Sequence, residues 1–320
     1  MRIISWTFAC AMAFATGMPG IAIAREGVTS ATTSFSDGFQ GELERVAASH
    51  KGDMAIYCHH LETDEVLAVN ENMPVETAST IKVAVMGAAM DALATGKGPF
   101  KDYYSTYAYD ASTSTGGSGI IQKFKDGSKL ELKELIHLMI TVSDNIGTNM
   151  LVEWMGIEPV NNWLISHGFE QTRMFSTVGG SRVYDAAGLK EWGLGRTTAK
   201  EMATLLEKIA TGKAGTTSTT DEMLRILGHQ YFDGGIASQV PPMTYVGSKS
   251  GSLNRLRADA AIVASPGGIY ILSIYTVHNQ DTRWTNDNEG ALGIQKISRM
   301  VWKHFNTKSD WEPADGADKF

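Results

Sequence analysis

The sequence is poor in cysteine, since its 320 residues include only Cys10 and Cys58. Cys10 lies in an N-terminal segment that we expect to be removed, which leaves Cys58 alone in the mature chain. A single cysteine cannot form an intrachain disulfide, so the folded protein must be stabilised by its hydrophobic core. With 43% hydrophobic and 20% charged residues, the composition is typical of a globular protein of one large or two smaller domains.

The sequence also lacks the features of several functional classes. Its formal net charge of −7 provides no basic surface, so we expect no nucleic-acid partner. It contains no glycine-rich phosphate-binding loop. His59 and His60 are adjacent in an expected strand and would point to opposite faces, which argues against a shared metal site. We therefore expect neither a metal nor another cofactor.

The N-terminus has the pattern of a secretory signal peptide. Arg2 precedes an apolar stretch, Ile3 to Ala15, and the segment ends in the small-x-small sequence Ala22-Ile23-Ala24. Residues 1–24 are predicted to be a signal peptide cleaved after Ala24, and residues 25–36 a flexible N-terminus. We expect a periplasmic or secreted protein without a stable membrane span after cleavage, because no other run approaches the ~18 apolar residues of a spanning helix.

The spacing of hydrophobic residues changes along the chain from a pattern typical of strands to one typical of helices, and then back. A first helix is expected near Phe39–Ala48, followed by a hairpin of Met54–Cys58 and Glu65–Val69. Helical spacing then dominates from Ser79 to about residue 228, apart from a long loop without a period over Thr172–Gly195. The last part of the chain is expected to contain strands at Tyr245–Ser250, Ala258–Ala264 and Ile269–Val277, and a helix at Asn288–Phe305.

This order predicts an α+β fold, an α/β sandwich in which N- and C-terminal helices flank an antiparallel sheet and an all-helical lobe is inserted. The expected α/β lobe comprises residues 37–78 and 229–307, the helical lobe residues 79–228, and a polar tail residues 308–320. Within the helical lobe, capping boxes at Thr198–Glu201 and Thr219–Glu222 predict two helix starts.

A candidate nucleophile lies in the sequence Thr77-Ala78-Ser79-Thr80-Ile81-Lys82, directly before an apolar run. If Ser79 opens a helix, Lys82 lies on the same face one turn later, beside the serine hydroxyl. A lysine whose pKa is lowered by burial can take the proton of that hydroxyl, and free N–H groups at the helix start can stabilise a negative carbonyl oxygen. Ser-x-x-Lys alone is not diagnostic, because about one copy is expected by chance in a chain of this length.

Two further short motifs lie where a cleft between the two lobes would place them. Ser143-Asp144-Asn145 occupies the connection between two expected helices, and Lys249-Ser250-Gly251 lies on the first strand after the helical lobe. Each alone would suit a helix N-cap or a strand end. Together and in this order, the three motifs resemble Ser-x-x-Lys, Ser-Asp-Asn and Lys-Thr-Gly of class A β-lactamases and penicillin-binding serine hydrolases, over residues 39–305.

This resemblance implies the residues of an acylation reaction. Ser79 would be the acylated nucleophile and Lys82 its proton acceptor, while Ser143 would relay a proton to the leaving nitrogen. The backbone N–H groups of Ser79 and Ser252 would form the oxyanion hole.

The resemblance also implies how substrate would be bound. Asn145 would hold the side-chain amide of the substrate. Lys249 would provide positive potential, and Ser250, which keeps the hydroxyl of the usual threonine, would help to bind the substrate carboxylate. An arginine often shares that task in the family, and Arg257 fits the position better than Arg255.

One element of the family pattern is missing. Members that hydrolyse β-lactams fast carry a glutamate on the long loop, with an asparagine four residues later, and this glutamate activates the deacylating water. The corresponding zone, Gly179–Ala187, contains no glutamate, and its one carboxylate belongs to Asp185. Asp185 is therefore the possible deacylation base, although no asparagine follows it at the expected distance.

The sequence leaves more than one function open. The first is an exported serine hydrolase that acylates Ser79 and opens a β-lactam or a related cyclic amide. The alternatives are a penicillin-binding-protein-like peptidase or esterase, and a β-lactam-binding sensor that deacylates slowly. In every case the expected partner is a small-molecule substrate, a β-lactam or a peptide-like amide.

Overall fold

A computed structural model describes residues 35–314 of the chain. The predicted signal peptide (residues 1–24), nearly all of the predicted flexible segment and the end of the polar tail lie outside these residues. Residues 36–314 belong to one compact unit. No helix within residues 35–314 has the length and the apolar character that crossing a membrane requires.

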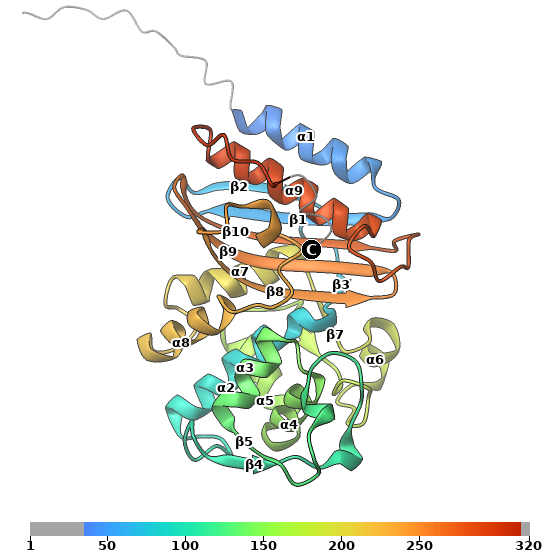
Figure 1. Ribbon diagram of the computed structural model, residues 1–320, viewed down its shortest axis with the longest axis vertical. Coiled ribbons are helices and arrows are strands. Elements are labelled where there is room, and N and C mark those ends of the chain that lie inside the picture. Colours follow the sequence, from blue (N-terminus) through green and yellow to red (C-terminus); the bar gives the residue numbers. More distant parts are fainter. Residues whose placement is uncertain (1–34, 315–320) are drawn as a thin grey trace, which may run out of the picture. The chain divides into compact units, whose positions relative to one another are not determined.

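A five-stranded antiparallel sheet in the order β2-β1-β10-β9-β8 organises this unit (Figure 1). Its strands are β1 (Asp53–His60), β2 (Glu65–Val69), β8 (Tyr245–Leu253), β9 (Leu256–Ser265) and β10 (Gly268–Val277). The predicted hairpin and the three predicted C-terminal strands are all present. Because Ile56 on β1 lies opposite Ile274 on β10, segments from the two ends of the chain meet in the middle of one sheet.

Helices cover both faces of the sheet. α1 (Phe35–Ser49) and α9 (Glu289–Phe305) lie on one face, and α7 (Ala199–Ala210) packs on the other (Figure 1). The alternation of side chains along β1 explains this arrangement, because Met54 and Ile56 are buried toward α1 and α9 whereas Ala55 joins the core on the opposite face. The predicted α+β sandwich is confirmed.

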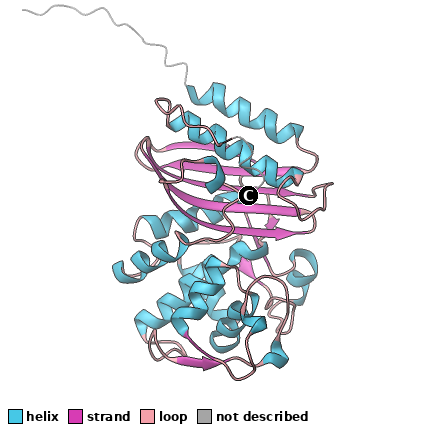
Figure 2. Cartoon of the chain, in the orientation of Figure 1, coloured by secondary structure: helices cyan, strands magenta, loops and turns pink. Residues whose placement is uncertain are grey.

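The inserted helices pack around α2, an apolar helix with nine buried residues. They occupy the part of the unit below the sheet in Figure 2. Gly96, in the left-handed conformation with a φ of 64°, ends α2. The helices of this region are α2 (Lys82–Thr95), α3 (Leu132–Thr141), α4 (Asn145–Met155), α5 (Ile157–Ser166), α6 (Ala186–Trp192) and α8 (Thr217–Leu227).

Two short sheets complete the described residues. The three-stranded sheet has the order β3-β7-β6 and contains β3 (Val75–Glu76), β6 (Arg173–Met174) and β7 (Gly195–Thr197). β4 (Thr106–Ala108) pairs with β5 (Lys129–Glu131). The three-stranded sheet matters for the site, because it joins the strand before Ser79 to both ends of the long loop.

Two helix starts differ from the sequence prediction. The helix expected from Ser79 begins as a 3-10 turn, η1 (Ala78–Ile81), and α2 follows from Lys82. The capping box predicted at Thr219–Glu222 was wrong, because Thr216 is the N-cap of α8 and accepts the Thr219 N–H. Residues 216–220 are all serine or threonine, and their capping ability is nearly the same. The predicted cap at Thr198 is confirmed by its hydrogen bond from the Glu201 N–H.

Candidate active site

One cleft brings the three motifs together. It has a volume of about 1590 Å³ and is lined by η1, by the edge strand β8 and by part of the long loop. The predicted site residues in its lining are Ser79, Ser143, Asn145, Ser250, Ser252 and Arg257. Lys82 and Lys249 are fully buried and do not belong to this lining.

Ser79 lies at a sharp change in chain direction. Ala78, directly before it, has a φ of 45°, a conformation that residues with side chains rarely adopt. Strand β8 comes close to this turn, since a Cβ added to Gly251 would lie 3.0 Å from the Ser79 nitrogen. The glycine therefore allows the backbone at Ser79 to lie beside the strand that carries Ser252. The two residues predicted for the oxyanion hole stand on neighbouring backbone segments.

Lys82 is fully buried, and its amine contacts the second motif. Nζ donates to the Ser143 carbonyl oxygen at 2.7 Å, to Ser143 Oγ at 3.2 Å and to Asn145 Oδ1 at 2.8 Å. Among the described residues, no hydrogen bond joins Lys82 Nζ to Ser79 Oγ. Burial and the nearby charge of Lys249 hold the pKa of Lys82 well below its usual range, and Asp144 opposes this shift. A lysine whose pKa is lowered in this way releases its proton more readily and can then act as a base.

Asp144, the middle residue of the second motif, joins two segments of backbone. Its side chain is completely buried, and Oδ1 caps α4 by accepting the Gly147 N–H at 2.9 Å. Oδ2 accepts the N–H groups of Ile120 and Ile121 at 2.6 and 2.9 Å. The helix-capping role that Ser-Asp-Asn can have in any protein is therefore present, and the same carboxylate also fixes the loop that precedes the motif.

The two neighbours of Asp144 face the cleft. Ser143 has a φ of 54° and is almost fully buried, with its hydroxyl beside Lys82. Asn145 donates through Nδ2 to the Gly116 carbonyl at 3.1 Å, while its Oδ1 accepts from Lys82. These two contacts fix the orientation of the Asn145 amide before any substrate arrives.

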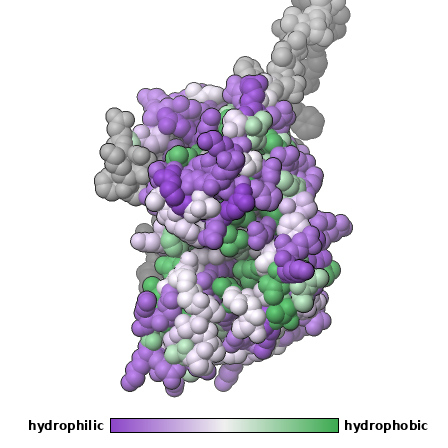
Figure 3. Space-filling model, turned by 90° about the vertical axis from the view of Figure 1, so that its right-hand side faces the viewer, coloured by the Kyte–Doolittle hydropathy of each residue, from purple (hydrophilic) through white to green (hydrophobic). Residues whose placement is uncertain are grey.

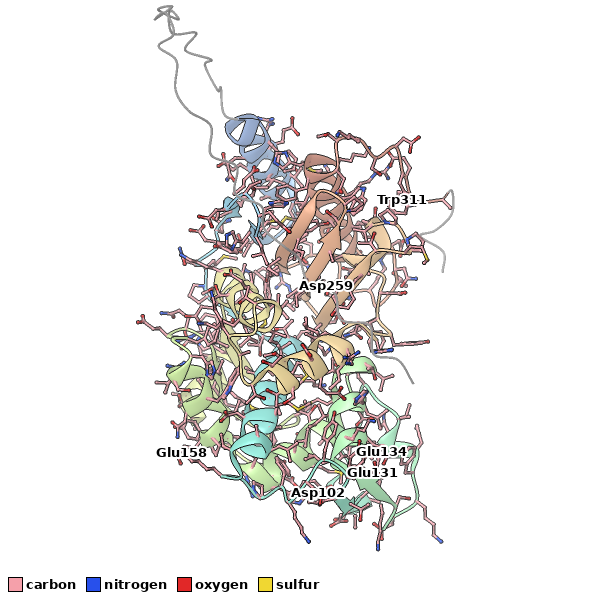
Figure 4. The ribbon with its side chains drawn as sticks, turned by 90° about the vertical axis from the view of Figure 1, so that its left-hand side faces the viewer. Asp102, Glu131, Glu134, Glu158, Asp259 and Trp311 are labelled. Carbon is pink, nitrogen blue, oxygen red and sulfur yellow. The ribbon has the colours of Figure 1, made fainter. Side chains whose placement is uncertain are left out.

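The lysine of the third motif is buried, and so is a carboxylate on the neighbouring strand that influences its pKa. Lys249 Nζ donates to the Ser250 carbonyl at 2.8 Å, and burial lowers the pKa of Lys249 to about 7 although the Asp259 carboxylate opposes this shift. Asp259 lies opposite Ser250 on β9, and burial raises its pKa to about 6. Figure 4 shows Asp259 where the sheet meets the helices below it. Both groups therefore change charge close to neutral pH.

Of the two candidate arginines, Arg257 lines the cleft. Its Nη1 donates to the Leu253 and Leu256 carbonyl oxygens, and its guanidinium lies 4.8 Å from the ring centroid of Trp284. Arg255 instead donates to the carbonyl oxygens of residues 278 and 279 and is absent from the cleft lining. The placement of the two side chains agrees with the sequence preference for Arg257.

Asp185 lies outside the lining of this cleft. Its Oδ1 accepts the N–H groups of Ala187 and Gly188 and so caps α6. Its side chain lines a separate cavity of about 390 Å³. This placement gives no support to the prediction that Asp185 activates the deacylating water.

Several residues of the cleft were not identified from the sequence. Three are carboxylates, Glu76, Asp233 and Asp259, and Asp259 could have been noticed as the only charge in the apolar run Ala258–Ala264. Three are exposed aromatic residues of the lining, for which the sequence offers no signal: Tyr231, Phe232 and Trp284. Figure 3 shows apolar side chains gathered in the middle of one face of the molecule, between hydrophilic regions.

The fold and the sequence match known proteins over most of their length. The model of a beta-lactamase enzyme family matches residues 38–305. No curated protein matches the sequence. A beta-lactamase from Sphaerobacter thermophilus is 23% identical, with a TM-score of 0.73, over 85% of this chain and 98% of that one.

Two further solved structures have the same fold. A beta-lactamase from Chitinophaga pinensis is 21% identical, with a TM-score of 0.74, over 83% of this chain and 99% of that one. A mutant of PBP-A, in an acyl-enzyme complex with penicillin G, is 23% identical, with a TM-score of 0.74, over 85% of this chain and 97% of that one.

Proposed function

The chain belongs to the beta-lactamase enzyme family, and on that premise we propose that Ser79 is its nucleophile and forms an acyl-enzyme. The protein is a serine hydrolase of the β-lactamase type. The observation that supports the residue assignment is the environment of Lys82, a buried amine with a lowered pKa one turn after Ser79. A serine hydroxyl needs such a base, because it is a weak nucleophile while it holds its proton.

In the proposed acylation step, neutral Lys82 accepts the proton of the Ser79 hydroxyl while Oγ attacks the amide carbonyl carbon. The backbone N–H groups of Ser79 and Ser252 stabilise the oxyanion that develops. The carbon–nitrogen bond then breaks, and the proton passes from Lys82 to the leaving nitrogen through Ser143 Oγ, which lies 3.2 Å from Nζ. An ester of Ser79 remains.

The proposed binding site surrounds this reaction centre. Asn145 presents an amide whose orientation is already fixed, and it binds the amide side chain of the substrate. Ser250 on β8 and Arg257 on β9 bind the substrate carboxylate, and buried Lys249 provides positive potential behind them. The exposed ring of Trp284 lies against the Arg257 guanidinium and adds an apolar surface next to this anionic site.

The proposed substrate is a β-lactam or a related cyclic amide. A mutant of PBP-A, which has the same fold, forms an acyl-enzyme complex with penicillin G. The second candidate is a penicillin-binding-protein-like peptidase or esterase, or a sensor that deacylates slowly. The placement of Asp185 outside the cleft favours this second candidate.

We also propose, from the sequence of residues 1–24, that the protein is exported to the periplasm or secreted.

Intact-mass measurement with a penicillin, followed over time, tests the proposal. We expect the wild-type protein to gain the mass of one penicillin and Ser79→Ala to gain none. An adduct that forms and clears while hydrolysed product accumulates indicates a working β-lactamase, whereas a persistent adduct indicates the second candidate. An equal adduct on Ser79→Ala would show that Ser79 is not the nucleophile.

A further inference from the structure

The described part of the cleft contains three carboxylates that could face an acyl group on Ser79. They belong to Glu76, Asp233 and Asp259. Hydrolysis of an ester in such a site needs a base that takes a proton from water. The three carboxylates differ in position, in burial and in the partners they already have, and these differences separate them.

Asp259 and Asp233 are poorly suited to this task. Asp259 is 2% exposed, and its Oδ2 already accepts the Ile236 N–H at 2.8 Å. The charge of Asp259 also raises the pKa of Lys249, so Asp259 belongs to the anion-binding part of the cleft. Asp233 is exposed to bulk solvent on a loop, whereas a deacylation base has to hold one water molecule at the ester.

Glu76 lies on β3, three residues before Ser79 in the sequence. β3 pairs with β7, the strand at the end of the long loop. The carboxylate lies against that loop, because Oε1 would be only 3.3 Å from a Cβ at Gly193, which also lines the cleft. Gly193 has a φ of 61°, so glycine suits both its backbone conformation and the close approach of Glu76.

The Glu76 carboxylate is free to bind water. Among the described residues it accepts no hydrogen bond and forms no ion pair, although Arg196 lies opposite it in the strand pair. Arg196 instead donates through Nε to the Gln171 carbonyl and lines the separate cavity. Burial raises the pKa of Glu76 above its usual value, while His278 opposes this shift, so the carboxylate is a stronger base than an exposed one.

We propose that Glu76 is the general base of deacylation, reaching the cleft from the strand before the nucleophile and not from the long loop. This inference rests on the proposed acyl-enzyme at Ser79. Glu76 takes a proton from a water molecule, and the hydroxide adds to the ester carbonyl carbon. The bond between that carbon and Ser79 Oγ then breaks, and the proton returns from Glu76 to Oγ, which restores the enzyme and releases the carboxylic acid.

The test is to measure acylation and deacylation separately by rapid mixing with a penicillin and intact mass. We expect Glu76→Gln to form the adduct within a few-fold of the wild-type rate and to lose it at least about 100-fold more slowly. Two matched controls should clear the adduct within about 2-fold of the wild-type rate. They are Glu191→Gln, on the long loop but outside the cleft, and Asp233→Asn, in the cleft but exposed.

A second variant separates loss of the base from loss of local structure. Glu76→Ala leaves space for a small carboxylate, so added formate should accelerate clearance of its adduct, whereas a disordered site would not respond. Equal clearance rates for Glu76→Gln and the wild type would overturn the inference about Glu76, but the proposed acyl-enzyme at Ser79 would stand. A wild-type adduct that never clears would also overturn it. If the wild type forms no adduct at all, the proposed function fails and the inference with it.

Discussion

Replacement of Asp144 should destabilise the fold far more than replacement of another helix-capping aspartate. Asp144 is completely buried and accepts N–H groups from Gly147, Ile120 and Ile121. A hydrogen bond to a charged group contributes about 1.5–3 kcal/mol, so three of them set an upper range of roughly 4.5–9 kcal/mol. Neighbouring bonds are not additive, and we therefore expect Asp144→Ala to lower the free energy of unfolding by about 4 kcal/mol.

Asp185 provides the matched control. It also caps a helix, but its carboxylate is exposed and accepts only the N–H groups of Ala187 and Gly188. Loss of an exposed cap costs about 1 kcal/mol, and this is the value we expect for Asp185→Ala. Asp144→Asn should fall between the two alanine variants, because the amide keeps one acceptor and loses the charge.

Urea denaturation, followed by circular dichroism and tryptophan fluorescence, measures these differences. The midpoint should shift while the slope with denaturant stays constant, because the surface exposed on unfolding is the same. If Asp144→Ala and Asp185→Ala lower the free energy of unfolding equally, the three hydrogen bonds of Asp144 do not stabilise the fold as their burial indicates.

Two further predictions concern the site itself. Gly251→Ala should slow acylation of Ser79 at least about tenfold in single-turnover assays, because its Cβ would meet the Ser79 nitrogen at 3.0 Å and displace β8; an unchanged rate would show that this approach is not needed. The pKa of Lys249 is about 7, so its positive charge is lost as the pH rises through that value. Binding of a penicillin to Ser79→Ala, measured by calorimetry, should therefore weaken above pH 7, and an affinity independent of pH would contradict this.

The strands and helices could be predicted because buried apolar residues recur along the sequence with the spacing typical of each element. Residues 54–58 and 269–277 are apolar over the lengths of strands, and the alternate side chains of β1 enter different cores. The pairing of β1 with β10 has no such local signal, because it depends on packing between residues more than 200 positions apart. The start of α8 was missed because several neighbouring serine and threonine residues could each have capped the helix.

For the site, the sequence provided the reactive residue types but not their contacts. The order of the three motifs placed Ser79, Ser143 and Ser250 around one cleft. Spacing could not reveal that Lys82 binds Ser143 and Asn145, because these residues follow it 61 and 63 positions later in the sequence. Asp185 was chosen by its position in the loop, and the helix that it caps has only seven residues, too few to show a period.

The pairing of β1 with β10 also determines when the molecule can fold. During synthesis, all residues from α2 to α8 are made between β2 and β8, so β1 and β2 leave the ribosome well before β8, β9 and β10. Until then β1 and β2 form a hairpin with an unpaired edge, which is marginal in water and prone to pair with other chains. Assembly of the sheet therefore has to wait for the last strands, and the pairing of such distant segments is slow. A nascent chain of this protein should depend on chaperones until its C-terminal strands are available.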